Sequence, residues 1–482
     1  MIQADYDVII LGGGGAGIVS GVAAGALGLR VLLIEKNRLG GECLNTGCVP
    51  SKALVHAAKV ASLTRRGSEF GLEAIPLSRE SARGALDYVR RSIIKVRDAD
   101  ATEALLHEHG VRVRYGSAEF TGPDTLTLDG AILRARHFIV ATGSSPARPP
   151  IPGFKQADCL TNEEIFSLPE PPESLAIVGA GPIGVEMAQA FQRLGVNVTL
   201  VEALPRILPK DDTELVINLE SILRGEGVDI RLQTRVERVE TAGGMKRLHL
   251  TGPGESTSLD AHEILFAVGR RPNTDGLNLT AAGVEVKDGG IRVDSYLHTT
   301  GPHVWACGDV TGAHQFSHVA EYEAKLLVQN LFLPFRQKIS YRTEAWATFT
   351  DPELAHVGLT EKEARGRGIK YEVLRHPFSQ DDRANVEGEG QGMVKILVTR
   401  WRGKILGAQI LGPRAGELIQ EFVLAMRNGL SIRDIADAIH VYPTLTVASQ
   451  RAAQHWYERR AAEPAVAAAL SLYRRFWLWR ND

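Results

Sequence analysis

Cysteine is scarce in this sequence. There are four in 482 residues, and two of them, Cys43 and Cys48, lie five positions apart. The other two, Cys159 and Cys307, stand alone, so the chain has no disulfide framework of the kind that small secreted domains need. This scarcity favours a cytoplasmic location. In that compartment a close cysteine pair indicates catalysis or metal binding more often than a structural bridge.

An excess of charge of either sign is also missing. The chain has 55 basic and 57 acidic residues and a formal net charge of −2, so the basic surface of a nucleic-acid-binding protein is not expected, nor is a nucleic-acid partner. With 44% hydrophobic and 23% charged residues, the composition is that of a globular protein. The length predicts about two to four domains.

Long hydrophobic runs are limited to one candidate. Residues 8–29 carry no charge over 22 positions, which is long enough to span a bilayer. The run contains eight glycines, four of them consecutive, and these favour a tight turn over a uniform helix. Asp5 and Asp7 precede it, where a signal peptide has basic residues. We therefore predict neither a membrane span nor a signal peptide.

The same region has the pattern of a strand, a glycine turn, a helix and a second strand. The marked positions are three glycines and a terminal acid: Gly12, Gly14, Gly17 and Glu35. In a Rossmann unit the first glycine makes the tight turn, the second lets the backbone approach a pyrophosphate, and the third allows close helix–strand packing. The helix N-terminus attracts phosphate, and the acid accepts hydrogen bonds from the adenosine ribose.

This pattern recurs over residues 174–202. Its marked positions are Gly179, Gly181, Gly184 and Glu202, and in both copies the acid follows the third glycine by 18 residues. Two units predict two dinucleotides, and a chain that holds two usually moves electrons between them. The alternative, that one unit is a relic, is less favoured because both retain all three glycines and the acid. A Pro/Glu-rich stretch at 167–174 marks the expected boundary between the units.

Further motifs accompany the two units along the chain. They are GGECLNTGCVPSK at 40–52, Ala141-Thr142-Gly143 at the end of a strand, FAVGRRPNT at 266–274 with Gly269, ACGDV at 306–310 with Asp309, and FTDPELAHVGLTE at 349–361. In this order they resemble the class I flavoprotein pyridine nucleotide-disulfide oxidoreductases, the family of dihydrolipoamide dehydrogenase, glutathione reductase and mercuric reductase. The last segment resembles the first strand of the family's C-terminal interface domain.

The resemblance implies an α/β fold with two Rossmann-like domains, one for FAD and one for NAD(P), and an α+β C-terminal dimerisation domain. The expected bounds are 1–150 for the FAD domain, 151–271 for the NAD(P) domain, 272–340 for a central segment that completes the FAD domain, 341–460 for the dimerisation domain, and 461–482 for a basic, aromatic tail. It also implies a homodimer in which the interface domain of one subunit completes the active site of the other. The residues expected to contact FAD include Ala141, Thr142, Gly143 and Asp309, and Gly269 lies at the return from the NAD(P) domain.

Cys43 and Cys48 resemble the redox-active disulfide of this family. In an ideal helix, residues five apart lie about 8–9 Å apart at Cα, whereas a disulfide tolerates about 7 Å. The pair can therefore bond only where the helix is distorted, which Asn45 and Gly47 allow. A distorted disulfide is easily reduced. No second cluster of Cys or His lies close in sequence, so no metal site is predicted.

The resemblance also implies a role for each member of the redox-active segment. Cys48 is the thiol beside the flavin, and Cys43 is the thiol that meets the substrate. Lys52 resembles the lysine beside the flavin ring, and we expect it to pair with Glu186, because a buried ammonium needs a partner. The implied activity is that of a flavin-dependent NAD(P)H disulfide or metal-ion oxidoreductase.

The second acid bears on the choice of nicotinamide cofactor. Glu202 accepts hydrogen bonds from the 2′-hydroxyl of NADH and repels the 2′-phosphate of NADPH, so NADH is favoured. Arg206, four residues further on, softens that preference, and NADPH stays an alternative. Pro182 stands where the family often has a tyrosine that gates the nicotinamide pocket.

The family pattern breaks in HVYPTLTVAS at 440–449. His440 matches the first residue of the motif HxHPTxxE, but Tyr442 replaces the catalytic His and Val447 replaces its orienting Glu. A phenol with a pKa near 10 is a poor proton shuttle, so ordinary dihydrolipoamide or glutathione turnover is not expected. Mercuric reductase also has tyrosine here, although this chain lacks that enzyme's N-terminal CxxC domain and paired C-terminal cysteines. We predict a mercuric reductase-like enzyme with a small disulfide or thiophilic metal ion as acceptor, and His440 is an alternative base.

The sequence leaves alternatives open for the role of the C-terminal tail and for the function of the protein. Residues 465–480 combine aromatic and basic side chains, which is typical of a helix at a membrane surface but more often of one that packs on its own domain or on a dimer mate. The alternative functions are a dihydrolipoamide dehydrogenase-type enzyme, a diaphorase or transhydrogenase, and a redox-sensing regulatory flavoprotein.

Overall fold

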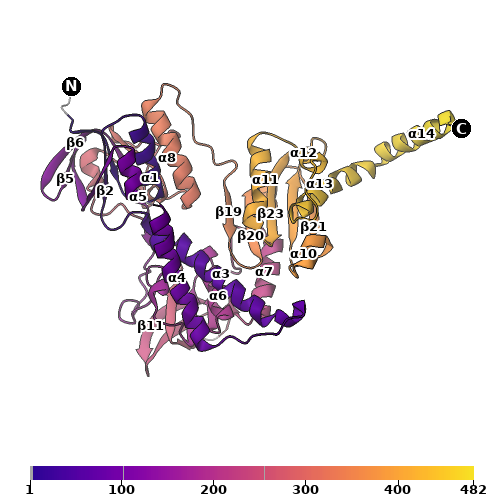
Figure 1. Cartoon of the computed structure of the whole chain (residues 1–482), viewed down its shortest axis with the longest axis horizontal. Coiled ribbons are helices and arrows are strands. Elements are labelled where there is room, and N and C mark those ends of the chain that lie inside the picture. Colours follow the sequence, from indigo (N-terminus) through magenta and orange to yellow (C-terminus); the bar gives the residue numbers. More distant parts are fainter. Residues whose placement is uncertain (1–3, 101, 255, 482) are drawn as a thin grey trace. The chain divides into compact units, whose positions relative to one another are not determined.

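The computed structural model describes residues 4–100, 102–254 and 256–481, which form two compact units (Figure 1). The first unit comprises the chain up to Arg65, Ala74–Ala203 and Asp229–Ser340. The second comprises Arg66–Glu73, Leu204–Val228 and the chain from Tyr341 onward. The domain boundaries expected from the sequence stay predictions.

The first unit contains a seven-stranded sheet that begins with the charge-free run of the sequence. Its strands are β1 (Tyr6–Leu11), β2 (Val31–Glu35), β3 (Val111–Tyr115), β4 (Ala118–Gly122), β5 (Thr125–Leu128), β6 (Ala131–Val140) and β18 (Val304–Ala306). The order is β3-β2-β1-β6-β5-β4, and β18 pairs with β6. Strands β1, β2, β3, β6 and β18 run parallel. Because parallel strands are covered on both faces, β1 and β2 are nearly continuous apolar runs.

A second parallel sheet in this unit repeats the arrangement. Its strands are β8 (Ser174–Val178), β9 (Asn197–Val201), β10 (Asp229–Arg231) and β14 (Glu263–Phe266), in the order β10-β9-β8-β14. Smaller sheets are formed by β11 (Arg235–Ala242), β12 (Met245–Thr251) and β13 (Thr257–Ala261), by β16 (Val286–Lys287) and β17 (Gly290–Ile291), and by β7 (Ser144–Pro146) and β15 (Arg270–Pro272). The β7–β15 pair lays the segment after Gly143 beside the segment after Gly269.

The helices of the first unit lie between these strands. They are α1 (Gly15–Ala26), α2 (Gly41–Asn45), α3 (Cys48–Arg65), α4 (Arg79–Asp100), α5 (Thr102–Glu108), α6 (Pro182–Arg193) and α8 (Ser317–Phe332), with short 3-10 turns at Ile165–Ser167, Leu279–Ala282 and Asp309–Thr311. The two predicted strand–turn–helix–strand units are therefore confirmed, as β1-α1-β2 and β8-α6-β9.

The second unit is built on a five-stranded antiparallel sheet. Its strands are β19 (Ala345–Thr348), β20 (Glu353–Gly358), β21 (Glu372–Pro377), β22 (Met393–Val398) and β23 (Ile405–Gly412), in the order β19-β20-β23-β22-β21. The expectation that 349–361 holds the first strand of this sheet is wrong, because β19 precedes it and pairs with β20. Its helices are α7 (Thr213–Gly225), α9 (Glu361–Gly366), α10 (Asp382–Val386), α11 (Ala415–Arg427), α12 (Ile432–Asp437), α13 (Thr446–Ala461) and α14 (Pro464–Asn481), with 3-10 turns at Gly67–Phe70 and Phe378–Gln380.

The core of the second unit lies between its sheet and its helices. Phe378, Phe422 and Trp456 are among the buried side chains of this cluster, from the 3-10 turn after β21, from α11 and from α13 respectively. None of the helices in the described part of the chain is both long enough and apolar enough to cross a membrane.

Candidate redox site

The first glycine of each Rossmann unit makes the turn that only glycine tolerates there. Gly12 has φ +105°, and a Cβ on it would lie 2.4 Å from the Ala141 carbonyl oxygen. Gly179 has φ +102°, and its Cβ would lie 2.5 Å from the Ala267 carbonyl oxygen. The same strained turn and the same close approach occur in both copies. Each turn therefore lies against the residue that directly follows the neighbouring strand of its sheet, which is β6 for Gly12 and β14 for Gly179.

The third glycine of each unit closes the helix onto the turn. A Cβ on Gly17 would lie 1.8 Å from the Gly12 carbonyl oxygen, and one on Gly184 would lie 1.9 Å from that of Gly179. Neither position accepts a side chain, which matches the packing role predicted for it.

The second glycine faces open space. The nearest atom to a Cβ on Gly14 would be 3.9 Å away, and nothing lies within 4 Å of one on Gly181. No side chain caps the N-terminus of α1 or of α6, so the helix ends are left to an external anion. Both loops thus fit the pyrophosphate of a dinucleotide, as FAD and NAD(P) require.

The acids that end β2 and β9 hold their own glycine loops. Glu35 accepts a hydrogen bond from the Gly13 amide at 2.7 Å, and Glu202 accepts one from the Ala180 amide, also at 2.7 Å. The other Glu35 oxygen accepts from the Asn37 amide. Each carboxylate therefore fixes the turn beside it, in addition to the ribose contact predicted for it.

The cysteines lie on either side of a helix break. Cys43 is in α2 and Cys48 is the first residue of α3, and the structure holds both as thiols. Asn45 stabilises the end of α2 by donating to the Gly41 carbonyl oxygen at 2.7 Å. A Cβ on Gly47 would lie 3.3 Å from the Cys43 Cα, so the break folds the chain back onto α2. The predicted distortion of the helix is confirmed.

The two thiols have pKa values shifted in opposite directions. A hydrogen bond between the thiols raises the pKa of Cys43, and burial raises it further. The same bond lowers the pKa of Cys48 to about 6, aided by Ser317 and by the charge of Lys52 and opposed by burial and Glu186. The Sγ of Cys48 lies 3.5 Å from the Ser317 Oγ at the start of α8. At neutral pH, Cys48 is therefore the thiolate of the pair and Cys43 the thiol.

We predict that Cys48 in the dithiol enzyme titrates near pH 6, and that Ser317→Ala raises this pKa because the thiolate loses a hydrogen-bond donor. The measurement is the pH dependence of thiolate absorbance after reduction. Ser51→Ala is the matched control, since Ser51 donates to the Cys48 carbonyl oxygen and not to its thiol. Equal shifts in the two variants would contradict the assignment.

The ion pair expected beside the cysteines is present. Lys52 Nζ lies 2.8 Å from Glu186 Oε2, and the Glu186 side chain is only 4% exposed. Lys52 is on α3, one turn after Cys48, and Glu186 is on α6 of the second Rossmann unit. The pair therefore links the redox segment to the helix that carries the second dinucleotide loop.

Two charged residues that the sequence analysis did not single out adjoin the site. Glu42, directly before Cys43, forms a bidentate ion pair with Arg270, which follows Gly269; one of its two contacts, between Nη1 and Oε1, is 2.5 Å long. Asn162 donates to the same Glu42 oxygen and to the Thr46 carbonyl oxygen at the helix break. The sequence could have pointed to both residues only through their positions, because Glu42 lies in the motif at 40–52 and Arg270 in the motif at 266–274.

Arg270 also connects this pair to Asp309. Its Nε donates to the Ser144 hydroxyl at 2.8 Å, and that hydroxyl donates to Asp309 Oδ2 at 2.5 Å. Burial raises the pKa of Asp309, partly offset by Ser144 and Arg270. Asp309 opens a 3-10 turn after Gly308, whose φ is +77°. The segments after Gly143, Gly269 and Gly308 are thus joined in one polar network next to the cysteines.

Tyr442 lies on the second unit and is 64% exposed. Its hydroxyl donates to Asp382 Oδ2 at 2.9 Å, and this bond to a carboxylate raises the pKa of Tyr442 above its usual value. Val447, which replaces the orienting Glu, is buried. A phenol whose pKa is raised in this way is an even poorer proton shuttle at neutral pH than a free one.

His440 is nearly buried, with a side chain 8% exposed. Its Nδ1 lies 3.0 Å from the Ala438 carbonyl oxygen and its Nε2 lies 2.9 Å from Glu421 Oε1. Both ring nitrogens are occupied, so use as a base requires one of these bonds to break. Burial raises the pKa of Glu421, opposed by the charge of His440 and the hydrogen bond to it.

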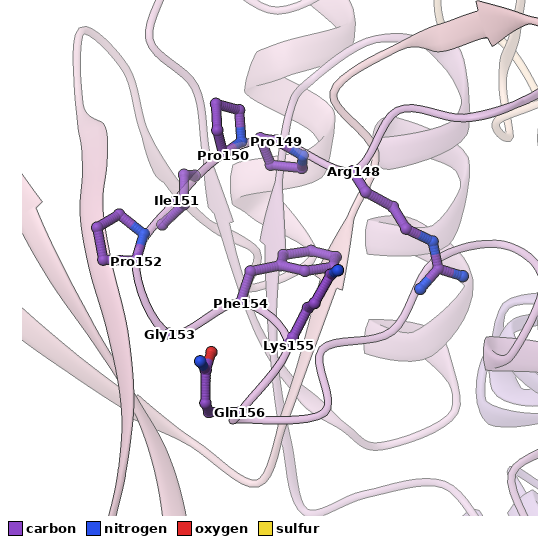
Figure 2. Close-up of a pocket in the computed structure, with 9 residues that line it drawn as sticks. All are labelled: Arg148, Pro149, Pro150, Ile151, Pro152, Gly153, Phe154, Lys155 and Gln156. Atoms are coloured by element: carbon purple, nitrogen blue, oxygen red, sulfur yellow. The ribbon is translucent and has the colours of Figure 1, made fainter.

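A pocket of about 340 Å³ in the first unit is separate from the candidate redox site. It is lined by the consecutive residues 148–156, which curve around the Phe154 ring (Figure 2). None of the candidate residues lines it. The open space that matters for the dinucleotides is at the glycine loops.

Comparison with known proteins agrees with this geometry. The pyridine nucleotide-disulphide oxidoreductase family matches residues 6–324, and the dimerisation domain of the same family matches residues 345–453. Mercuric reductase of Bacillus cereus is 34% identical over 92% of this chain and 70% of its own length. Dihydrolipoyl dehydrogenase of Halobacterium salinarum is 35% identical over 94% of this chain and 97% of its own.

A solved structure is also similar over nearly the whole chain. The Cu(II) complex of RclA, an HOCl-induced flavoprotein disulfide reductase from Escherichia coli, has a TM-score of 0.83 at 29% identity and covers 94% of this chain and 100% of its own. The chain belongs to the pyridine nucleotide-disulphide oxidoreductases. It is therefore a flavin-dependent enzyme of a family that uses FAD and a pyridine nucleotide, and its dimerisation domain indicates a homodimer.

Proposed function

We propose that this enzyme is a mercuric reductase-like oxidoreductase that uses the Cys43–Cys48 pair to reduce a thiophilic metal ion or a small disulfide with electrons from NADH. FAD, when bound, supplies the two-electron chemistry that links the nicotinamide to the cysteine pair. The observation that carries the proposal is the pair itself, held across a helix break beside the Lys52–Glu186 ion pair with its two thiol pKa values shifted apart.

Each thiol has a distinct part in this scheme. Cys48, with its pKa near 6, is the thiolate of the reduced pair. Cys43 is then the thiol that engages the acceptor. Lys52 stabilises negative charge at Cys48, and Ser317 donates a hydrogen bond to it. Glu42 and Arg270 hold the segment that carries Cys43.

Tyr442 favours a metal ion or a small, reactive disulfide over lipoamide. A metal ion enters by ligand exchange at the thiolates, which demands little proton transfer from residue 442. A dithiol product of ordinary thiol–disulfide exchange needs an acid–base group of pKa near neutrality, and Tyr442 is far from that. The names of the relatives support the same class, since one reduces mercury and the RclA structure holds Cu(II).

An acceptor panel tests the proposal. We expect NADH oxidation with Hg(II), Cu(II) or small disulfides to exceed that with lipoamide by at least about tenfold in kcat/KM, a difference of about 1.4 kcal/mol in transition-state stabilisation. Quinones serve as the control for direct flavin oxidation. Robust turnover of dihydrolipoamide at mildly alkaline pH would sink the proposal and favour a dihydrolipoamide dehydrogenase-type function.

Glu202 carries the proposed preference for NADH. We predict that Glu202→Gln raises kcat/KM for NADPH relative to NADH by about tenfold, because a carboxylate no longer repels the 2′-phosphate while an acceptor for the Ala180 amide is kept. Glu35→Gln is the matched control in the first loop. Its NADPH/NADH ratio is expected to stay that of the wild type, and a change there would assign the preference elsewhere.

A further inference from the structure

Helix α14 presents large apolar side chains that its own chain does not cover. Leu472, Phe476 and Trp479 are 66%, 53% and 76% exposed. Figure 1 shows α14 continuing from α13 and extending away from the sheet of the second unit. Large side chains exposed together in this way mark an interaction surface.

These side chains form one row along the helix. With 100° per residue, positions 465, 469, 472, 476 and 479 fall within an arc of about 80°. The spacing alternates between four and three residues, which is the seam of a coiled coil. The row is Ala465, Ala469, Leu472, Phe476 and Trp479. The small residues Ala465 and Ala469 lie at the end of the row nearest α13, where they would let a second helix approach closely. The large residues lie toward the C-terminal end of α14.

The charges of α14 do not suit a membrane surface. A helix lying on a bilayer gathers its basic residues on one polar face. Here Arg474, Arg475 and Arg480 point in three directions, separated by about 100–140°. Leu470 and Tyr473, about 40–100° beyond the edge of the row, are also exposed, so apolar side chains cover about half of the circumference. A helix with apolar side chains on so many sides is usually enclosed by protein.

The start of α14 is fixed on the dimerisation domain. Glu463, the residue before α14, pairs with Arg400 at 2.5 Å and lies 3.6 Å from Arg460 of α13. The matched dimerisation domain ends at residue 453, within α13. The apolar row therefore lies on the helix that directly follows α13, in which the matched dimerisation domain ends.

We propose that the row Ala465–Trp479 of α14 packs against α14 of a second copy of this chain, and that this contact extends the homodimer interface. A symmetric dimer places equivalent elements of both subunits around its two-fold axis, so one apolar row is covered by an identical one. The contact does not depend on the identity of the electron acceptor.

Site-specific cross-linking of the flavin-loaded, full-length enzyme tests this. Leu472 is the middle residue of the row, so it faces its equivalent whether the two helices run parallel or antiparallel. Treated with a short bismaleimide, the Leu472→Cys variant is expected to give covalent dimers at a yield at least five times that of Arg474→Cys, about 200° away on the helix. Peptide mass spectrometry identifies the 472–472 link. Equal yields at the two positions would overturn the proposal.

Hydrogen exchange provides a second, independent test of the α14 contact. Amides of α14 are expected to be protected in the dimer and to lose that protection in a Leu472→Ser/Phe476→Ser variant, while β20 and β23 keep theirs. NADH oxidation and flavin absorbance, both unchanged, show that the variant is folded. Unprotected α14 amides in the wild type, or flotation of the enzyme with phosphatidylglycerol vesicles without a 472–472 link, would assign α14 to a membrane surface and overturn the proposal.

Discussion

Cys43→Ser is expected to lower turnover of the physiological acceptor by at least about 10³-fold while NADH continues to reduce the flavin. The reason is that a hydroxyl neither forms a disulfide nor binds a thiophilic metal ion, so the acceptor loses the thiol that we propose it engages. Quinone reduction is expected to persist, because it draws electrons without the pair. Steady-state rates with both acceptors, measured on one preparation, separate the two effects.

Cys159→Ser is the control for this variant. Cys159 is buried, and burial raises the pKa of its thiol to about 11, so it is unreactive at neutral pH and its loss is expected to leave turnover near the wild-type value. Cys48→Ser separates the roles within the pair: it removes the thiol that contributes most to the raised pKa of Cys43, so this pKa is expected to fall in the variant. If Cys43→Ser kept more than about a tenth of wild-type turnover, the pair would not lie on the path to the acceptor.

The glycine loops were predictable because their chemistry is local. Gly12 is required by the positive φ of its turn and Gly17 by the Gly12 carbonyl oxygen in that turn, and the sequence motif records both requirements directly. The acid of each unit was also found, but its contact with its own loop was not: Glu35 bonds to Gly13 and Glu202 to Ala180. The predicted hydrogen bond to the ribose belongs to the dinucleotide-bound motif. The hydrogen bond to the loop amide depends on how tightly the turn folds back toward the acid.

The polar network around Arg270 shows where prediction from sequence stops. Glu42 and Arg270 are separated by 228 positions, and no periodicity links residues so far apart. Lys52 and Glu186, separated by 134 positions, were paired in advance only because the family resemblance supplied the partner. When a charged residue lies inside a motif, the motif indicates roughly where that residue lies in the fold. Its ion-pair partner can be identified only from the folded chain.

The same limit applies to Tyr442 and His440. The motif predicted that the expected base was missing, which is a statement about residue types. It could not predict that the Tyr442 hydroxyl donates to Asp382, or that Glu421, 19 positions before His440, occupies the ring nitrogen of that histidine. These contacts strengthen the case against ordinary acid–base catalysis, because each of the two side chains is already committed to a carboxylate.

The second unit contains a buried cluster that the sequence gave no reason to expect. Lys395 is 2% exposed and its Nζ lies within 2.8 Å of carboxylate oxygens of Asp212, Glu214 and Glu361. These contacts join α7 and α9 to β22, which lies between β23 and β21 in the sheet. A lysine is rarely buried unless it is paired, so this ammonium and its carboxylates depend on one another.

Lys395→Met is expected to lower the free energy of unfolding of the second unit by about 3–5 kcal/mol, because it leaves the carboxylate of Asp212, whose side chain is 3% exposed, buried without its counter-ion. Lys362→Met, an exposed lysine on α9, is the control and is expected to change stability by less than about 0.5 kcal/mol. Hydrogen exchange of β22 amides as a function of denaturant measures both. A Lys395→Met effect as small as that of the control would show that the ammonium contributes no net stability.

The loss of stability in Lys395→Met is also expected to depend on pH, and to be smaller at low pH. Burial raises the pKa of Glu361, but the hydrogen bond and charge of Lys395, together with hydrogen bonds from Arg365 and Tyr371, outweigh it and lower that pKa to about 2. A carboxylate whose folded-state pKa is lowered contributes stability that is full above its unfolded pKa of about 4.3 and is lost as the pH falls toward the folded value. The difference between wild type and Lys395→Met is therefore largest above about pH 5 and shrinks as the pH falls toward about 2. A difference that stayed constant over this range would assign the lysine's contribution to its methylene packing and not to its charge.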